Sequence, residues 1–303
     1  MVRFLHCSDV HITEDYSKVP WLKLGWRRWL ALVELKLGRA AAFAEAEASL
    51  SQIARRANGD GVDHLVLSGD VTAYSLEAEF SRARAALGEI AEDPRRCTVI
   101  PGNHDRYTPG AVATRRFEKY FGHLLVSDLP EYCREGPFPF VRLVGQEAAV
   151  VGLCSARVPP IPGFSMGVVG RRQLGGVREI IQDPRLAARA VLVVVHHAPL
   201  THRGRRDRLS HGLLDGDALL TALPGPRYAV LHGHIHRRYH HPATAARPHI
   251  FGAGSSTQRG EEGYWTIDVA DGRVLGWAKH ALEAPAAALK PVSTSPVRAH
   301  SDG

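Results

Sequence analysis

Cysteine is scarce in this 303-residue sequence, and the four that occur do not have a metal-binding or redox spacing. No two of them form a Cys-x-x-Cys pair, and three lie in or beside apolar runs: they are Cys7, Cys97, Cys133 and Cys154. All-cysteine ligation of a structural zinc ion is therefore not expected. We expect buried free thiols in a reducing compartment.

Long apolar runs are also missing. None approaches the roughly 20 residues that a membrane-spanning helix requires. The apolar start, residues 2–7, is too short for a signal peptide and leads directly into a polar motif. The expected location is the cytoplasm, with peripheral contact to the inner surface of the membrane as an alternative.

The charge balance is not neutral: the net charge of +7 is carried mainly by arginine. It favours an anionic partner, such as a nucleotide, a phospholipid surface or nucleic acid, without choosing among them. The basic stretches are not interleaved with aromatic residues, and no separate DNA-binding domain is apparent. Nucleic acid is therefore not the expected partner.

Short apolar runs alternate with helical patterns along the chain. Apolar runs of about four to six residues suit strands that are covered on both faces. We expect strands at 4–7, 64–67, 97–100, 149–153, 191–195 and 228–231, and two more at 250–252 and 264–267 that close one sheet. Helices are expected at 39–56 and 76–90. This alternation predicts an α/β fold with layered sheets.

Polar side chains follow five of these strands at the point where each strand ends. They occur in Ser-Asp-Val-His, Ser-Gly-Asp, Gly-Asn-His-Asp, His-His-Ala-Pro and His-Gly-His-Ile-His, and are Asp9, His11, Asp70, Asn103, His104, Asp105, His196, His197, His234 and His236. In α/β sheets, ligands bind at the carboxyl ends of the strands. Each motif alone could be a turn, but five in order are hard to explain as turns.

This residue set suits a pair of divalent cations. Two ions about 3.5–4 Å apart can bind both the attacking and the leaving oxygen in a displacement at phosphorus. Holding them requires a bridging carboxylate together with nitrogen and oxygen ligands, which suit Mn, Fe or Zn.

The motifs, in this order, resemble those of the calcineurin-like metallophosphoesterases, and they span residues 9–236. The resemblance implies a two-sheet αββα sandwich with a dinuclear metal site at the carboxyl ends of the strands. It also implies that Asp70 bridges the ions, that Asp9, His11 and His236 hold one of them, and that Asn103, His196 and His234 hold the other. Of the His-His pair, His196 rather than His197 is the expected ligand.

The resemblance also implies roles for two neighbours of Asn103. His104 would lie near the scissile phosphate, stabilise its developing charge and protonate the leaving oxygen. Asp105 would orient His104; the alternative role for Asp105 is a helix N-cap before Thr108 and Pro109.

Two segments are candidates for setting the substrate. Residues 21–37 carry three of the five tryptophans beside Lys and Arg, which is typical of interfacial helices, although a helix packed on the domain is the alternative. The segment 201–208 holds four arginines, of which Arg203, Arg205 and Arg206 are predicted to bind a phosphate or a lipid headgroup. A solvated loop is the alternative there.

The function implied is that of a two-metal hydrolase that cleaves a phosphodiester or pyrophosphate bond in a small or amphiphilic substrate. Such enzymes include cyclic-nucleotide and glycerophosphodiester phosphodiesterases. Alternatives are a membrane-associated UDP-diacylglucosamine-type pyrophosphohydrolase, a nuclease and a non-catalytic scaffold. We expect one catalytic domain, residues 1–282, followed by a disordered tail, 283–303, rich in Ala, Pro and Ser.

Overall fold

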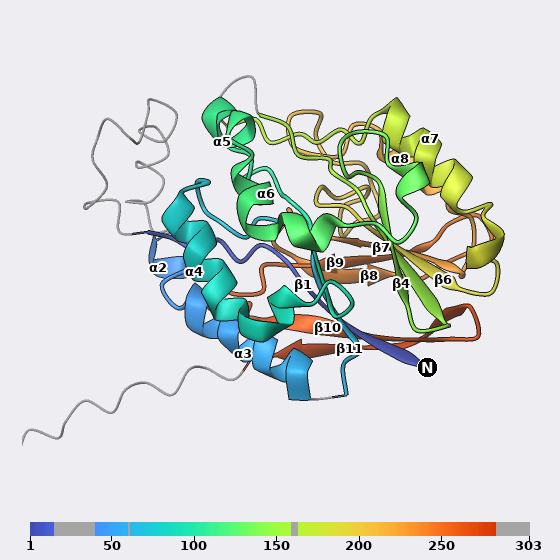
Figure 1. Ribbon diagram of the computed structural model, residues 1–303, viewed down its shortest axis with the longest axis horizontal. Helices are drawn as coiled ribbons and strands as arrows, with labels where there is room; N and C mark the ends of the chain where they lie inside the picture. Colours follow the sequence, from blue (N-terminus) through green and yellow to red (C-terminus); the bar gives the residue numbers. More distant parts are fainter. Residues whose placement is uncertain (15–39, 60, 159–162, 283–303) are drawn as a thin grey trace, which may run out of the picture.

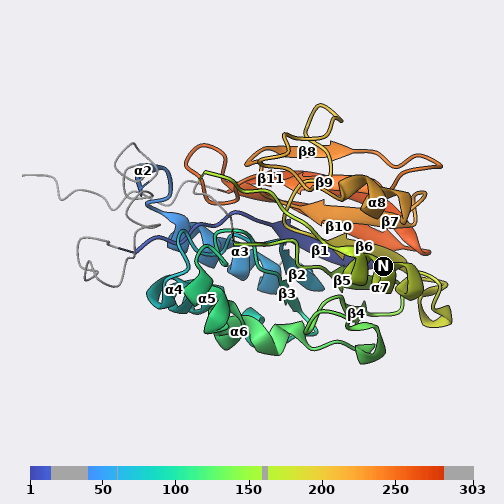
Figure 2. The ribbon, with the colours of Figure 1, turned by 90° about the horizontal axis from the view of Figure 1, so that it is seen from above.

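The computed structural model describes residues 1–14, 40–59, 61–158 and 163–282. Two β-sheets pack face to face in it, and helices lie on the outer face of each sheet (Figures 1 and 2). The predicted interfacial segment 21–37 and the predicted tail 283–303 lie outside the described residues. Within the described ranges, no helix has both the length and the apolar character needed to cross a membrane.

The first sheet has five strands in the order β11-β10-β1-β2-β3. Its three parallel strands are β1 (Val2–Cys7), β2 (His64–Leu67) and β3 (Cys97–Val99). The antiparallel strands β10 (Gly263–Ala270) and β11 (Arg273–Ala281) extend the sheet beyond β1. The carboxyl ends of β1, β2 and β3 therefore lie at the same edge.

The second sheet has six strands in the order β4-β5-β6-β7-β9-β8. Its parallel centre consists of β5 (Ala148–Gly152), β6 (Ala190–Val194), β7 (Tyr228–His232) and β9 (His249–Ala253). The antiparallel strands at its two edges are β4 (Phe140–Val144) and β8 (Arg238–His241).

Strand β6 shows how the apolar runs build two cores. Ala190, Leu192 and Val194 belong to the cluster that fills the space between the sheets, whereas Val191 and Val193 belong to the cluster on the outer face. Successive side chains of a strand point to opposite faces, so an all-apolar run fits a strand that is covered on both sides.

Helices cover the outer face of each sheet. On the first sheet, α3 (Ala46–Gly59) and α4 (Glu77–Leu87) bury Ile53 and Phe80 in the same continuous cluster, which extends to the outer face of that sheet. On the second sheet, α7 (Arg171–Ile180) and α8 (Gly216–Thr221) bury Val177 and Leu219. The shorter helical segments are α2 (Ala40–Ala42), η3 (Gly88–Glu92), α5 (Pro109–Ala113), α6 (Arg116–Phe121), η4 (Gly122–Leu125), η5 (Pro130–Tyr132) and η6 (Pro184–Leu186).

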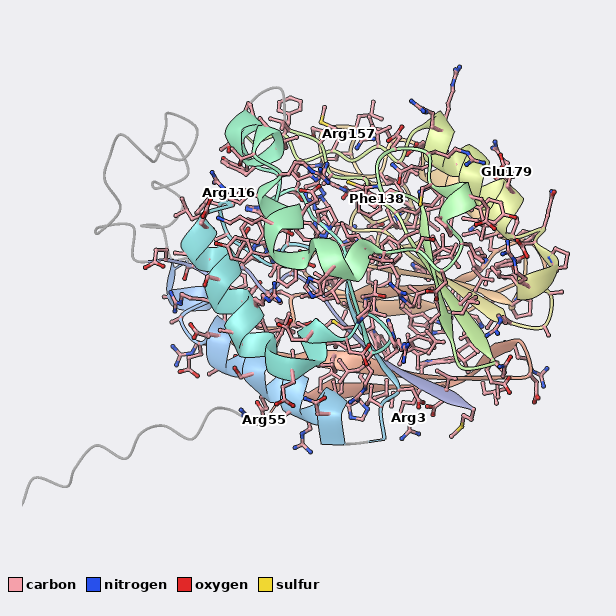
Figure 3. All side chains as sticks on the ribbon, viewed as in Figure 1. Arg3, Arg55, Arg116, Phe138, Arg157 and Glu179 are labelled. Carbon is pink, nitrogen blue, oxygen red and sulfur yellow. The ribbon has the colours of Figure 1, made fainter. Side chains whose placement is uncertain are left out.

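The polar sides of these helices face outward. Arg55 on α3 and Glu179 on α7 are exposed and lie on the two outer helical layers (Figure 3). At the start of α4, the Glu79 carboxylate accepts hydrogen bonds from the backbone N–H groups of Tyr74 and Leu76, at 3.0 and 2.9 Å. Glu79 therefore satisfies donors that the helix leaves open and fixes the loop that leads into it from β2.

The predicted fold class is confirmed, and each predicted strand corresponds to an observed one within a few residues. One prediction about the sheets is wrong: 250–252 and 264–267 do not close the same sheet, because β9 belongs to the second sheet and β10 to the first. Strands β4, β8 and β11 were not predicted, and the helix expected at 39–56 is interrupted by a turn at 43–45.

We expect Leu192→Ala to lower the free energy of unfolding by about 2–5 kcal/mol, because it leaves a cavity between the two sheets. Leu192 is fully buried there. Leu275 on β11 is 48% exposed, so Leu275→Ala is the matched control and should change stability by less than about 0.5 kcal/mol. Equilibrium unfolding in denaturant measures both, and equal losses would contradict this account of the core.

Candidate metal centre

Five loops meet at one edge of the sandwich, each directly after a strand: β1, β2, β3, β6 and β7. Backbone hydrogen bonds hold these loops together, from Asp9 N to Gly69 O and from His11 N to Asp70 O at 3.0 Å each, and from Gly233 N to His196 O at 3.0 Å. The polar residues predicted from the strand ends are therefore brought together by the sheet topology.

The first cluster consists of Asp9, His11 and His236. The Nε2 atoms of the two histidines lie 3.0 Å apart, and Asp9 Oδ1 is 3.3 Å from Nε2 of His236 and 3.8 Å from Nε2 of His11. This carboxylate oxygen is buried and receives no hydrogen bond of good geometry. Ligand atoms bound at about 2.1 Å from one ion and at right angles are about 3 Å apart, so the spacing fits a cation.

The second cluster consists of Asp70, Asn103, His196 and His234. Asn103 Oδ1 lies 3.1 Å from Nε2 of His196 and 3.0 Å from Nδ1 of His234, and Asp70 Oδ2 is 3.3 Å from His196 Nε2. The same Asp70 oxygen is 3.9 Å from Nε2 of His11 in the first cluster. Asp70 therefore lies between the clusters, in the position of a bridging ligand.

Hydrogen bonds on the outer sides of the rings fix which nitrogen faces each cluster. Nδ1 of His196 donates to the Ser68 carbonyl at 2.9 Å, and Nε2 of His234 donates to the His211 carbonyl at 2.9 Å. Nδ1 of His236 lies 3.1 Å from Gln258 Oε1. A proton held on the outer nitrogen leaves the inner nitrogen with a lone pair, which is the arrangement that orients histidine ligands around metals.

The backbone is strained at the same residues. Eight non-glycine residues of the described ranges have a positive φ, and five of them are predicted ligands: Asp9, His11, Asp70, His234 and His236, with φ between 48° and 75°. Such conformations cost on the order of 1–3 kcal/mol each and persist where the surroundings fix them, often at functional sites.

The centre attracts positive charge. Burial alone disfavours a charged imidazole at His196, but the Asp70 carboxylate outweighs it and raises the pKa of His196 to about 9. The buried Asp70 carboxyl has a pKa well below its usual range: burial works against this, and the positive charges of His196 and His104 overcome it. A cluster that retains protons in this way fits a cation in their place.

His196 and His197 point in different directions. The ring of His196 faces Asp70 and Asn103, whereas Nδ1 of His197 lies 2.8 Å from the Ser155 hydroxyl. The geometry therefore groups His196, and not His197, with Asp70 and Asn103, and its role as a ligand stays a prediction.

Asp105 does not orient His104 in the way that was predicted, nor does it cap a helix. Its carboxylate accepts four hydrogen bonds of 2.9–3.1 Å, from the backbone of Val71, Thr72 and Gly102 and from the Thr72 hydroxyl. The His104 ring donates from Nδ1 to the Ala73 carbonyl at 2.5 Å instead. Asp105 thus ties the loops after β2 and β3 together, and the N-cap of α5 is Thr108.

A cavity of about 750 Å³ opens over the two clusters. Asp70, Asn103, His104, His234 and His236 line one part of it, and residues from 163–165, 201–211 and Arg237 line the rest. The arginines predicted to bind substrate, Arg203, Arg205 and Arg206, are exposed and are not among the lining residues; Arg206 pairs with Asp217 instead. Arg208 of the same loop does line the cavity, together with Arg237.

One pair in this cavity is not indicated by any sequence motif. Nδ1 of His211 lies 2.6 Å from Asp207 Oδ2, and the His211 ring is 4.1 Å from the ring of His234. An i, i+4 pair of Asp and His is common on surfaces, and only the fold places this one beside the cluster. Gln258, whose side-chain oxygen contacts Nδ1 of His236, could not be predicted either, because only the fold brings it to the cluster.

Fold and site together define a class: an αββα sandwich with aspartate and histidine clusters at the strand ends is a metallophosphoesterase. The chain matches the family model for calcineurin-like phosphoesterases over residues 2–238 and belongs to that family. It is a metal-dependent phosphoesterase, with His/Asp groups that could bind the metals.

Solved structures share the fold. A dimetal phosphatase from Danio rerio is 13% identical, with a TM-score of 0.58 over 89% of this chain and 93% of that one. A purple acid phosphatase from seeds of yellow lupin (Lupinus luteus) is 11% identical, with a TM-score of 0.52 over 92% of this chain and 53% of that one. A comparison with curated protein sequences finds no match.

We expect Asp105→Ala to lower the free energy of unfolding by about 3 kcal/mol or more, because it leaves several buried N–H donors without an acceptor. Asp93→Ala is the control: Asp93 Oδ1 accepts one exposed hydrogen bond, from Arg95 N, so the cost should stay near 1 kcal/mol. Denaturant unfolding of metal-free protein measures both. Wild-type stability of Asp105→Ala would remove Asp105 from its structural role.

Proposed function

We propose that this protein is a hydrolase that uses two divalent metal ions to cleave a phosphodiester or pyrophosphate bond in a small phosphorylated substrate. Asp9, His11 and His236 would hold one ion, Asn103, His196 and His234 the other, and Asp70 both. The observation that carries the proposal is the convergence of carboxylate, amide and imidazole ligand atoms, above all the buried Asp9 Oδ1, which accepts no hydrogen bond of good geometry.

The metals, when bound, would supply a water of lowered pKa and a positive charge beside the phosphate oxygens. The rest of the chemistry falls to side chains. His104 lines the cavity, and the Ala73 carbonyl holds its Nδ1, so Nε2 is the atom that would give a proton to the leaving oxygen. The backbone N–H of His104 donates to Asp70 Oδ1 at 2.8 Å. This hydrogen bond holds the proton donor His104 next to the bridging carboxylate.

The polar lining of the cavity supports a hydrophilic substrate. In the described residues, hydroxyl, imidazole, guanidinium and carboxylate groups predominate there, and Ile235 is the largest apolar side chain. This suits cyclic-nucleotide or glycerophosphodiester substrates, and also the phosphate part of a UDP-diacylglucosamine-type pyrophosphate. Membrane contact through 21–37 stays a prediction, because that segment lies outside the described residues.

We expect the purified protein with Mn²⁺ to hydrolyse bis(p-nitrophenyl) phosphate faster than p-nitrophenyl phosphate, and a chelator to abolish both activities. Asp70→Asn should lower the rate by about 10³-fold, since metal-held charge contributes several kcal/mol to the transition state. The substitution should leave the fold intact, because the side-chain amide oxygen that it introduces can still accept a hydrogen bond from the backbone N–H of His104. Asp268→Asn, which breaks a surface pair with Arg3 at 2.7 Å, is the control.

We expect His196→Asn to lower the bound metal from two ions to one per chain, because the second cluster loses its central nitrogen. His197→Asn should retain both ions, since the His197 ring faces Ser155. Elemental analysis of the dialysed proteins measures the ratio. Loss of an ion only in the His197 variant would reverse the assignment.

A further inference from the structure

Two arginines line the cavity without a partner. In the described ranges, the guanidinium groups of Arg208 and Arg237 make no hydrogen bond or ion pair, whereas Arg206 pairs with Asp217. Both residues are exposed to solvent, and both line the cavity. They are therefore free to bind an anion.

Asp207 is the acid nearest in sequence to Arg208, and its carboxylate oxygens accept from groups other than the two guanidinium groups. Asp207 also lines the cavity, but its Oδ2 accepts from His211 at 2.6 Å and its Oδ1 from the backbone N–H of Arg208 at 2.7 Å. His202 also lines the cavity, and its pKa responds to the nearby positive charges. Partial burial lowers the pKa of His202, and the positive charges of Arg237 and Arg203 lower it further.

The lining of the cavity combines two kinds of group. The metal-ligand candidates would take the phosphate that reacts. Two guanidinium groups line the same cavity, together with the hydroxyl-bearing residues Thr201 and Ser210. A volume of about 750 Å³ is far larger than one phosphate requires and falls in the usual range of about 300–1,000 Å³ for ligand sites.

We propose that Arg208 and Arg237 form a second phosphate subsite, which makes a diester of pyrophosphate, such as a nucleoside diphosphate conjugate, the preferred substrate class. The inference rests on the proposed function, because the first phosphate is assigned to the metal centre. Guanidinium groups bind phosphate oxygens through paired, charge-assisted hydrogen bonds. A simple diester has one phosphate and leaves both arginines without an anion.

The subsite would act on the leaving group. The water oxygen forms a bond to the phosphorus at the metal centre, and the bond from that phosphorus to the bridging oxygen breaks. Both electrons of that bond stay with the second phosphate, the bridging oxygen would take the proton from His104 Nε2, and the two water protons pass to solvent, from which His104 regains one. Arg208 and Arg237 then face the phosphate that gains negative charge, where fixed cations stabilise the transition state.

Calorimetric titration of the Mn²⁺-loaded protein tests the subsite without turnover. The probes are methylenediphosphonate, which has two linked phosphonates, and methylphosphonate, which has one. In Arg208→Gln/Arg237→Gln, affinity for the diphosphonate should fall about tenfold per arginine, and affinity for methylphosphonate by less than about threefold. Arg206→Gln, on the same loop, is the matched control and should bind both as the wild type does.

A kinetic comparison separates this inference from the proposed function. In the double variant, kcat/KM for UDP-glucose should fall about 100-fold while that for bis(p-nitrophenyl) phosphate changes less than about threefold. Equal losses for both substrates, or equal losses of affinity for both phosphonates, would overturn the subsite, and so would no loss at all. If the wild type hydrolyses neither substrate but the arginine-dependent preference for diphosphonate persists, the subsite stands and the proposed function fails.

Discussion

The burial of two carboxylates at one edge of the sandwich is the constraint on which the site depends. Asp9 is fully buried and Asp70 is 2% exposed. Each has one oxygen bonded to a backbone amide, from His234 to Asp9 and from His104 to Asp70, and a second oxygen that faces histidine rings. A buried charge requires compensation. Protons on the rings could supply it, but each proton occupies a ring nitrogen lone pair, whereas bound cations would neutralise the carboxylates and coordinate the ring nitrogens.

The same constraint explains why the surrounding backbone is so unusual. Loops from different strands must approach the carboxylates closely: a Cβ on Gly102 would lie 2.1 Å from Asp70 Oδ1, and one on Gly233 would lie 2.2 Å from Asp9 Oδ2. Only glycine permits such an approach. The positive φ angles of the ligand candidates add strain in the same loops. The apolar cores on both faces of the second sheet, together with the hydrogen bonds of Asp105, offset this cost and hold the arrangement.

Features that follow from a local sequence pattern could be predicted, whereas contacts between residues far apart in the sequence could not. The central strands were found because strands covered on both faces are continuously apolar, whereas β8 (Arg238–His241) and β11 (Arg273–Ala281) are partly exposed edge strands with charged residues. The ligand candidates follow strands, so their convergence could be predicted. The role of Asp105 could not, because it depends on backbone donors about 30 residues away in sequence. Which arginines line the cavity could not be predicted, because the path of a loop decides which of its side chains reach it.

Part of the cavity lining, Arg208 included, comes from loops that carry no candidate ligand. The candidate ligands follow the ends of buried strands, where one-residue shifts would turn side chains to the wrong face. Two loops that line part of the cavity contact each other instead: Gly167 and Leu213 form a bridge, and the Asp215 carboxylate accepts from the backbone N–H groups of Val169 and Gly170 at 3.0 and 2.7 Å. Because these loops contribute little to the sheets, their polar residues can change without disturbing the carboxylates. A change of substrate within this fold would then require new loop residues, while the buried aspartates and histidines stay as they are.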